Sequence, residues 1–220
     1  MAAKGKGYKG IGMEGTIARR YASRAGKDLR RVAMEARQVS ACLPGGGQVL
    51  EVAPGPGLMA IELARTGKYQ VTGLDISATF VDIARQNAAA AGVQVDFRHG
   101  NAADMPFDDN NFDLVACSAA FKDFAEPVLA LREMHRVLRP SGRANVIDLR
   151  HDVSRAAVQA EVERMSLGPA PRVLTSLALR SFLAHRAYTR DQFDEFIART
   201  KFAASGIQQT PVSLAVHLQK

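Results

Sequence analysis

Short β-branched runs and amphipathic stretches alternate along the middle of the chain, from Gln48 to Leu149. Apolar residues at three-to-four spacing indicate helices, whereas short apolar runs bounded by turn residues indicate buried strands. The pattern predicts strands at 48–53, 69–75, 93–98, 112–117 and 143–149, with helices at 57–66, 78–91 and 125–138 between them. Such alternation is typical of a parallel sheet that is covered by helices on both faces.

The N-terminal part precedes this unit and has a different texture. Residues 1–12 are rich in glycine and lysine, so a disordered basic tail is expected there. Residues 13–43 are predicted to hold two helices, at 16–25 and 29–42, and the glycines that follow Pro44 end the second.

The C-terminal part adds further elements after the fifth strand. Residues 151–188 are predicted to be a helical insertion, with helices at 153–166 and 173–187. A helix at 190–200 and strands at 202–210 and 212–219 follow. We therefore predict an α/β fold with a Rossmann-like, doubly wound, seven-stranded sheet that is mostly parallel and has an antiparallel last strand.

The composition fits one globular domain, residues 13–220. The chain has 220 residues, of which 47% are hydrophobic, enough to bury a core without disulfides. Its two cysteines, Cys42 and Cys117, are too few for a disulfide framework or a zinc site, so no metal is expected. No run of about 18 apolar residues occurs, and no leader-like apolar segment follows the N-terminus. We expect a cytoplasmic protein without a membrane span.

Charge is unevenly distributed along the chain, although the net charge is +7. Residues 1–40 carry ten Lys and Arg against three Asp and Glu, whereas residues 41–149 carry nine against thirteen. The basic flank is either a solvated arm or a region that attracts nucleic acid, an anionic surface or an anionic substrate.

The residues VLEVAPGPG at 49–57 lead from a strand into a glycine turn and then a helix. Gly55 and Gly57 lack a Cβ, so the backbone there can approach a ligand closely. Glu51 narrows the choice of ligand, because a carboxylate repels a pyrophosphate and attracts a cation such as an ammonium or a sulfonium. The turn therefore predicts a site for a cofactor that carries positive charge.

A second acid, Asp75, ends the strand at 69–75 and comes 20 positions after Gly55. At this spacing a carboxylate can accept both hydroxyls of a ribose. The alternative is a capping acid before the helix at 78–91, where Ser77 is the expected N-cap.

Five segments together resemble the successive motifs of class I S-adenosylmethionine-dependent methyltransferases, close to the ubiquinone and menaquinone methyltransferases. They are VLEVAPGPG, GLDIS, HGNAADMPF, FDLVACSAAFKDF and ALREMHRVLRPSGR, in the family's order between Gln48 and Leu149. The resemblance implies S-adenosyl-L-methionine as cofactor and a small-molecule acceptor. It also implies an enzyme that works mainly by holding the acceptor close to the activated methyl group.

The resemblance further implies roles for individual residues. Ala53 stands where the family usually has glycine, which narrows the pocket slightly, and Tyr21 is expected either as a wall of the pocket or as simple packing. The implied contacts are Glu51, Ala53, Gly55 and Gly57 to the methionine part, Asp75 to the ribose, Ile76, Asn101 and Ala102 to the adenine, and Cys117 and Ser118 at the sulfonium end.

A general base is needed only when the acceptor arrives protonated. His151 and His185 are the candidates, although a lone histidine is more often a surface or packing residue. Lys122 and Asp123 follow the fourth strand, so topology also places them at the carboxyl edge, where ligands bind in such sheets. The leucine-rich segment 151–188 is expected to be a lid over an apolar acceptor, with a homodimer contact as the alternative.

Two other enzyme classes stay open. The basic flanks fit an RNA methyltransferase, which would make nucleic acid a partner, but no Asn/Asp-Pro-Pro-aromatic turn follows the fourth strand and the chain has no Trp. The glycine turn also fits an NAD-dependent oxidoreductase, but Glu51 opposes a pyrophosphate there. A module that binds the cofactor without catalysis is a further alternative.

Overall fold

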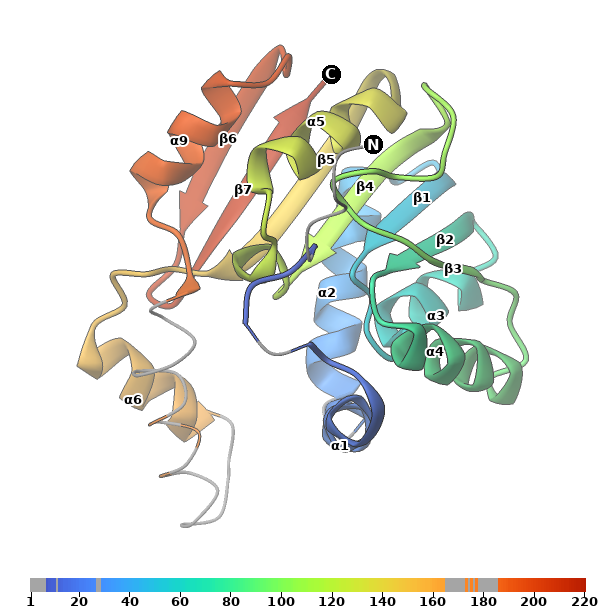
Figure 1. The fold of residues 1–220 in the computed structure, drawn as a ribbon, viewed down its shortest axis with the longest axis horizontal. Helices are drawn as coiled ribbons and strands as arrows, with labels where there is room; N and C mark the ends of the chain where they lie inside the picture. Colours follow the sequence, from blue (N-terminus) through green and yellow to red (C-terminus); the bar gives the residue numbers. More distant parts are fainter. Residues whose placement is uncertain are drawn as a thin grey trace.

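The structure is a computed structural model and describes residues 7–10, 12–26, 29–164, 173, 175, 177 and 186–220. A seven-stranded sheet runs through its centre in the order β3-β2-β1-β4-β5-β7-β6 (Figure 1). The strands are β1 (Gly47–Val52), β2 (Tyr69–Asp75), β3 (Asp96–His99), β4 (Phe112–Ser118), β5 (Leu138–Leu149), β6 (Ala204–Gln209) and β7 (Ser213–Gln219). Neighbouring strands from β3 to β5 pair in parallel, and β7 is antiparallel to β5 and β6. The predicted fold class is confirmed.

Helices cover both faces of the sheet. Helices α2, α3 and α4 pack on one face and α5 and α9 on the other, while α1 contacts α4. No helix in the described part of the chain is long and apolar enough to cross a membrane. The bounds are α1 (Gly15–Ala25), α2 (Leu29–Cys42), α3 (Leu58–Arg65), α4 (Ala78–Ala90), the 3₁₀ turn η1 (Phe121–Asp123), α5 (Pro127–Val137), α6 (Arg155–Arg164) and α9 (Arg190–Ala198).

Several element boundaries differ from the sequence prediction. Strand β3 begins at Asp96 instead of residue 93. Strand β5 begins at Leu138 instead of residue 143, because Leu138 pairs with Phe112 before the register shifts along β4. Helix α5 therefore ends at Val137. The helix predicted at 153–166 corresponds to α6, whereas most of the helix predicted at 173–187 lies outside the described residues.

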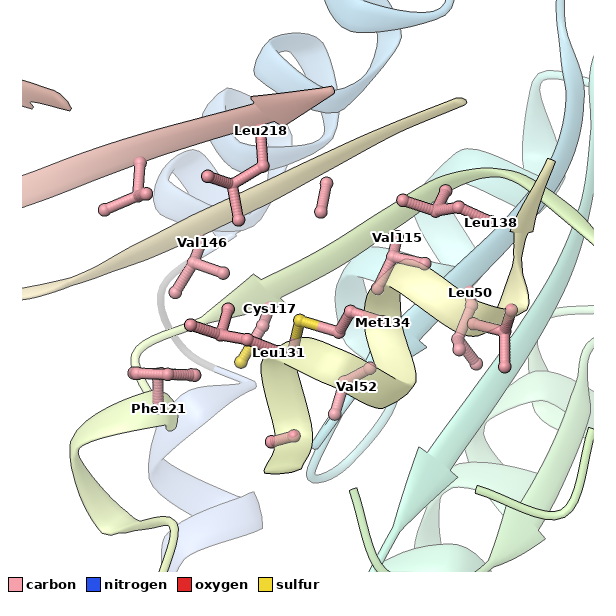
Figure 2. Close-up of a cluster of buried hydrophobic side chains, with 14 of the residues drawn as sticks. Leu50, Val52, Val115, Cys117, Phe121, Leu131, Met134, Leu138, Val146 and Leu218 are labelled. Carbon is pink, nitrogen blue, oxygen red and sulfur yellow. The ribbon is translucent and has the colours of Figure 1, made fainter. Parts of the chain in front are cut away.

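The main core lies between α5 and the sheet (Figure 2). Leu131 and Met134 on α5 are fully buried against Leu50, Val115 and Val146, which come from three parallel strands. Strands covered on both faces need apolar side chains at successive positions, which explains their continuous apolar runs. This packing fixes the carboxyl ends of β1 and β4 relative to each other.

The segment at residues 7–10 lies against the turn that follows β4. The Lys9 amide donates to the Asp123 carbonyl at 2.7 Å, and the Ala125 amide donates to the Gly7 carbonyl at 3.3 Å. Tyr8 forms a β-bridge with Phe124. The described part of the predicted disordered tail is therefore held in place, because backbone pairing with a distant turn leaves no trace in composition.

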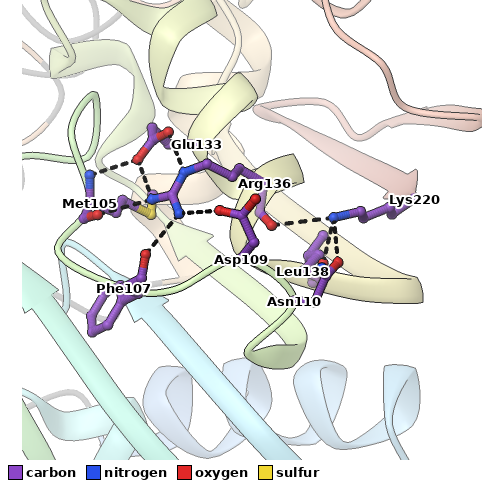
Figure 3. A network of polar contacts seen from close by, with 8 residues as sticks. All are labelled: Met105, Phe107, Asp109, Asn110, Glu133, Arg136, Leu138 and Lys220. Carbon is purple, nitrogen blue, oxygen red and sulfur yellow. Dashed lines mark hydrogen bonds and ion pairs between the residues drawn. The ribbon is translucent and has the colours of Figure 1, made fainter.

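A polar network fastens the long connection between β3 and β4 (Figure 3). Arg136 on α5 donates to the Met105 carbonyl at 3.0 Å and the Phe107 carbonyl at 2.7 Å. It also pairs with Glu133 at 2.7 Å and Asp109 at 2.8 Å. The connection contains no helix, as its Asp, Asn and Pro content predicts, so these side-chain bonds take the place of a helix in fixing it.

Replacing Arg136 with Met should destabilise the protein, because the backbone carbonyls of the connection would lose their donors. We expect the free energy of unfolding, measured in urea, to fall by about 2 kcal/mol. Arg65→Met is the matched control, since Arg65 forms only an exposed pair with Glu62 and should cost less than about 0.5 kcal/mol. Equal effects of the two substitutions would show that the network does not brace the connection.

Candidate functional site

A cavity of about 660 Å³ opens at the carboxyl edge of the parallel strands. Its walls come from the turn after β1, the ends of β2 and β4, the turn after β3, the helices α1 and α2, and the segment at residues 7–9. Ligands of open α/β sheets bind at this edge. Nine of the eleven predicted cofactor residues line it: Tyr21, Glu51, Ala53, Gly55, Asp75, Ile76, Asn101, Ala102 and Ser118.

The turn after β1 has a left-handed backbone at three positions. The φ angles are 56° at Ala53, 54° at Gly55 and 76° at Gly57. A Cβ at Gly55 would come no closer than 4.0 Å to Tyr21, so this position is open toward the cavity. A Cβ at Gly57 would instead lie 2.6 Å from Phe97. Gly57 does not line the cavity, and its role is to let α3 begin close to β3.

The turn and the second strand are joined through Asp75. One carboxylate oxygen accepts the Gly55 amide at 2.9 Å, and the other accepts the Ser77 amide at 2.9 Å. Burial raises the pKa of Asp75 to about 6, although these amides act in the opposite direction. Ser77 caps α4 by accepting the Phe80 amide at 3.1 Å, as predicted. Asp75 is thus held rigidly with lone pairs left over for a ligand.

Glu51, at the end of β1, is buried with only 5% of its surface exposed. Its Oε2 has no hydrogen-bond partner in the described part of the protein. Burial raises the pKa of Glu51 to about 8, and the nearby carboxylates of Glu35 and Asp75 add to the shift, while the Ala60 amide opposes it. A cation bound next to this buried acid would lower the pKa of Glu51 and give its free oxygen a partner.

Sequence reasoning missed Glu35, which lines the same cavity from α2. Its carboxylate is close enough to Glu51 to raise the pKa of that group. Glu35 belongs to no motif and occupies an ordinary helical position. Only the packing of α2 against α3 brings it to the cavity, so no local pattern could have identified it.

A second charged cluster of the cavity lies after β4. The Lys122 ammonium is 3.1 Å from Asp123 and 3.6 Å from Asp148, and it donates to the Ala119 carbonyl. Burial acts to lower the pKa of Lys122, but the two carboxylates outweigh it and the pKa is raised. Arg186 pairs with Asp123 at 3.0 Å. The cluster confirms that topology places Lys122 and Asp123 at this edge, and it keeps Lys122 positively charged.

The remaining predicted site residues are in different positions. Cys117 is buried in the main core (Figure 2) and does not line the cavity, because its side chain points to the α5 face of β4. His151 is exposed just after β5, its amide donates to the Tyr188 carbonyl at 3.2 Å, and it does not line the cavity either. His185 lies outside the described residues. Within the described segments, no group of three His, Cys, Asp or Glu could hold a metal ion.

The family model described as a methyltransferase domain matches residues 50–146. This segment is therefore similar to a methyltransferase domain. It contains β1 from Leu50, both acids that face the cavity, the braced connection after β3 and most of β5. The matched region therefore carries most of the cavity wall, while α1, α2 and residues 7–9 close the cavity from outside it.

Curated relatives resemble this chain over a similar range. A demethylmenaquinone methyltransferase from Deinococcus radiodurans is 39% identical over 102 residues, which is 46% of this chain and 42% of that protein. A ubiquinone/menaquinone biosynthesis C-methyltransferase from Bdellovibrio bacteriovorus is 36% identical over 104 residues, 47% of this chain and 44% of that protein. The alignments thus span less than half the length of these relatives.

Solved structures share the fold over most of the chain. A SAM-dependent methyltransferase from Aquifex aeolicus has a TM-score of 0.67 at 18% identity, covering 90% of this chain and 97% of that one. The plantazolicin methyltransferase BpumL, solved with SAH, has a TM-score of 0.68 at 14% identity, covering 92% and 89%. The likeness extends the shared fold beyond residues 50–146 to the helices and strands that flank this segment.

The left-handed conformation of Ala53 should carry a cost that glycine would remove. This backbone conformation costs an L-residue about 1–2 kcal/mol of the free energy of unfolding. Part of this cost is offset because alanine restricts the unfolded chain more than glycine does. We expect Ala53→Gly to raise the free energy of unfolding by up to about 1 kcal/mol in urea. Gly57→Ala should lower it by roughly 2 kcal/mol, since its Cβ would collide with Phe97. A loss of stability in Ala53→Gly would contradict this description of the turn.

Stability should fall between pH 6 and pH 8 because of Glu51. The folded state keeps the Glu51 proton up to a pKa of about 8, while the unfolded chain releases it near 4.5, so a rising pH favours unfolding. Asp75 also lowers the stability as the pH rises, but only up to its pKa of about 6. Urea unfolding should therefore show that the free energy of unfolding falls by roughly 2 kcal/mol between pH 6 and pH 8.

Glu51→Gln should abolish this loss, because an amide does not titrate. Glu62→Gln is the control, since Glu62 lies on the surface of α3 and pairs only with Arg65. A wild-type stability that stays level from pH 6 to pH 8 would mean that Glu51 is ionised in the folded protein.

Proposed function

We propose that this protein is an S-adenosylmethionine-dependent methyltransferase with a small, partly apolar acceptor. The observation that carries the proposal is the buried Glu51 carboxylate with an unpartnered oxygen, which faces the same cavity as the fixed carboxylate of Asp75. A methionine-derived nucleoside carries an ammonium for the first acid and ribose hydroxyls for the second. The relatives named methyltransferases support the proposal.

The cavity residues divide along the length of this ligand. Glu51 binds the ammonium, with Glu35 adding negative charge nearby, and the open turn at Gly55 accommodates the methionine part. Asp75 accepts the ribose hydroxyls. Ile76 covers the adenine, while Asn101 uses its Oδ1 on the Ala103 amide at 3.0 Å and keeps its amide group for the adenine edge. Ala53 and Ala102 contribute walls, and Ser118 lies at the sulfonium end.

The same charges disfavour an NAD-dependent oxidoreductase. A pyrophosphate placed on the turn after β1 would be repelled by the Glu35 carboxylate. It would also leave the buried Glu51 without the cation that its free oxygen requires. The acids beside the turn after β1 therefore favour a cationic methyl donor over a dinucleotide.

When bound, the cofactor supplies a methyl group that is already activated by its sulfonium. The chain's own residues then have to place the acceptor and exclude water. Lys122 stays charged, so it donates a hydrogen bond to an acceptor oxygen and does not take a proton. Asp123 is the carboxylate next to it that can accept one. His151 takes no part in this arrangement because it lies outside the cavity.

Apolar residues around the acceptor end suit a ring-containing molecule. Ile17, Leu58, Phe124 and Leu149 line the cavity together with the charged cluster at Lys122. The names of the curated relatives indicate quinone-type acceptors, and we propose that the acceptor here belongs to the same chemical class. We also propose that residues 13–220 act as one domain in the cytoplasm.

Calorimetric titration with S-adenosylhomocysteine tests the donor site. We expect saturable binding that Asp75→Ala weakens at least about tenfold, because hydrogen bonds to a charged group are lost. Glu51→Gln should weaken this ligand but leave 5′-methylthioadenosine unchanged, since that molecule has no ammonium. Glu62→Gln should bind as the wild type does.

NAD in a parallel titration and a methyl-transfer assay complete the test. Transfer of labelled methyl from S-adenosylmethionine to a demethylmenaquinol would support the acceptor class. Binding of NAD without S-adenosylhomocysteine would overturn the proposed function. Binding of S-adenosylhomocysteine without transfer to any quinol or phenol would restrict the error to the acceptor.

A further inference from the structure

Helix α1 presents basic and apolar side chains on one outward surface. Arg19, Arg20 and Arg24 are exposed, and Ile17 and Tyr21 are 49% and 44% exposed. Only Ala18 of this helix is buried. Figure 1 shows α1 beyond the carboxyl edge of the sheet, near the end of the molecule away from β6. We call these five residues the α1 surface.

The positive charge of the α1 surface is not balanced locally. The helix has no acidic residue, and Glu14 just before it is used elsewhere, because its carboxylate accepts the Ala78 and Thr79 amides at 2.9 and 3.1 Å. Glu14 thereby supplies hydrogen-bond acceptors for the free amides at the N-terminus of α4. No ion pair joins the three arginines to another described residue. The surface therefore attracts a partner with negative charge.

The apolar part of the α1 surface is also the rim of the cavity. Ile17 and Tyr21 line the cavity and are exposed at the same time. Tyr21 is held edge-on by Phe80, with ring centroids 5.7 Å apart. The α1 surface therefore borders the cavity where the cavity meets the solvent, and we call this border the entrance.

We propose that the α1 surface docks this entrance on an anionic lipid bilayer, from which the acceptor is taken. The inference rests on the proposed function for its purpose, but the docking itself can be measured without cofactor or acceptor. Arginines near an anionic bilayer each contribute attraction, and apolar side chains on the same surface insert between headgroups. The described helices include none that could span a bilayer, so the contact is peripheral.

A bilayer explains the arrangement better than a nucleic acid does. Two exposed apolar side chains among three arginines suit the boundary between headgroups and acyl chains. Single-stranded nucleic acid would instead require stacked aromatic residues along a basic groove, and Tyr21, the aromatic on α1, is already packed on Phe80. A competing RNA is therefore one outcome of the test.

Co-sedimentation with vesicles tests the docking on the full chain. We expect binding to vesicles that contain phosphatidylglycerol, weak binding to pure phosphatidylcholine, and weakening by salt. The triple variant Arg19→Gln, Arg20→Gln, Arg24→Gln should bind about 100-fold less tightly, at about 1 kcal/mol per arginine. Ile17→Ser should weaken binding through lost insertion.

The matched control removes the same charge from the opposite edge of the sheet. The control variant changes three exposed cations at the ends of α3 and α9 and the start of β2, by Arg65→Gln, Lys68→Gln and Arg199→Gln. It should bind vesicles as the wild type does. Both triple variants should keep the wild-type affinity for S-adenosylhomocysteine, which shows that they are folded.

Three results would overturn the docking proposal: no preference for phosphatidylglycerol, equal losses in the two triple variants, or displacement of the protein from vesicles by a short RNA that binds more tightly to the α1 surface. If vesicle binding behaves as expected but S-adenosylhomocysteine does not bind, the proposed function fails and the docking stands. The two claims are thus separated by independent measurements.

Discussion

Two buried carboxylates on either side of a glycine turn determine how the rest of the site is built. Asp75 is satisfied by the amides of Gly55 and Ser77, so it ties β1, β2 and α4 into one rigid edge. Glu51 differs, because its buried Oε2 has no hydrogen-bond partner among the described residues. Burying such a group without a partner is unfavourable, which is why a cationic ligand is the natural complement of this cavity.

The scaffold keeps these two acids in position from both sides. The core between α5 and the sheet fixes β1 beside β4, and Arg136 braces the irregular connection that carries Asn101. Outside the matched residues 50–146, α1, α2 and the segment at residues 7–9 close the cavity. The matched segment thus supplies most of the cavity wall, and the flanking helices complete it.

The fold and most of the residues that line the cavity could be predicted because their signals are local. Strand periodicity, the glycine turn and the spacing from Gly55 to Asp75 are all contained in short segments, and nine predicted residues line one cavity. Cys117 was misplaced because a one-residue step along a strand turns a side chain to the other face of the sheet. Glu35 and the pairing of residues 7–10 could not be predicted, since both depend on packing between distant segments.

The role of Gly57 shows the same limit in another form. Its position in the turn suggested contact with the ligand, but the space it leaves is filled by Phe97 and Ala84. A glycine can serve backbone approach to a ligand or to another element, and sequence alone does not separate the two.

Proton release on ligand binding is the most direct test of the central claim. Titrating the protein with S-adenosylhomocysteine at pH 7, in buffers of different ionisation enthalpy, measures the protons exchanged. With the pKa of Glu51 at about 8 in the free protein, binding of the ammonium should release about one proton per site, and Glu51→Gln should release almost none. Tight binding without proton release in the wild type would contradict the account, because Glu51 would then be ionised before the ligand arrives.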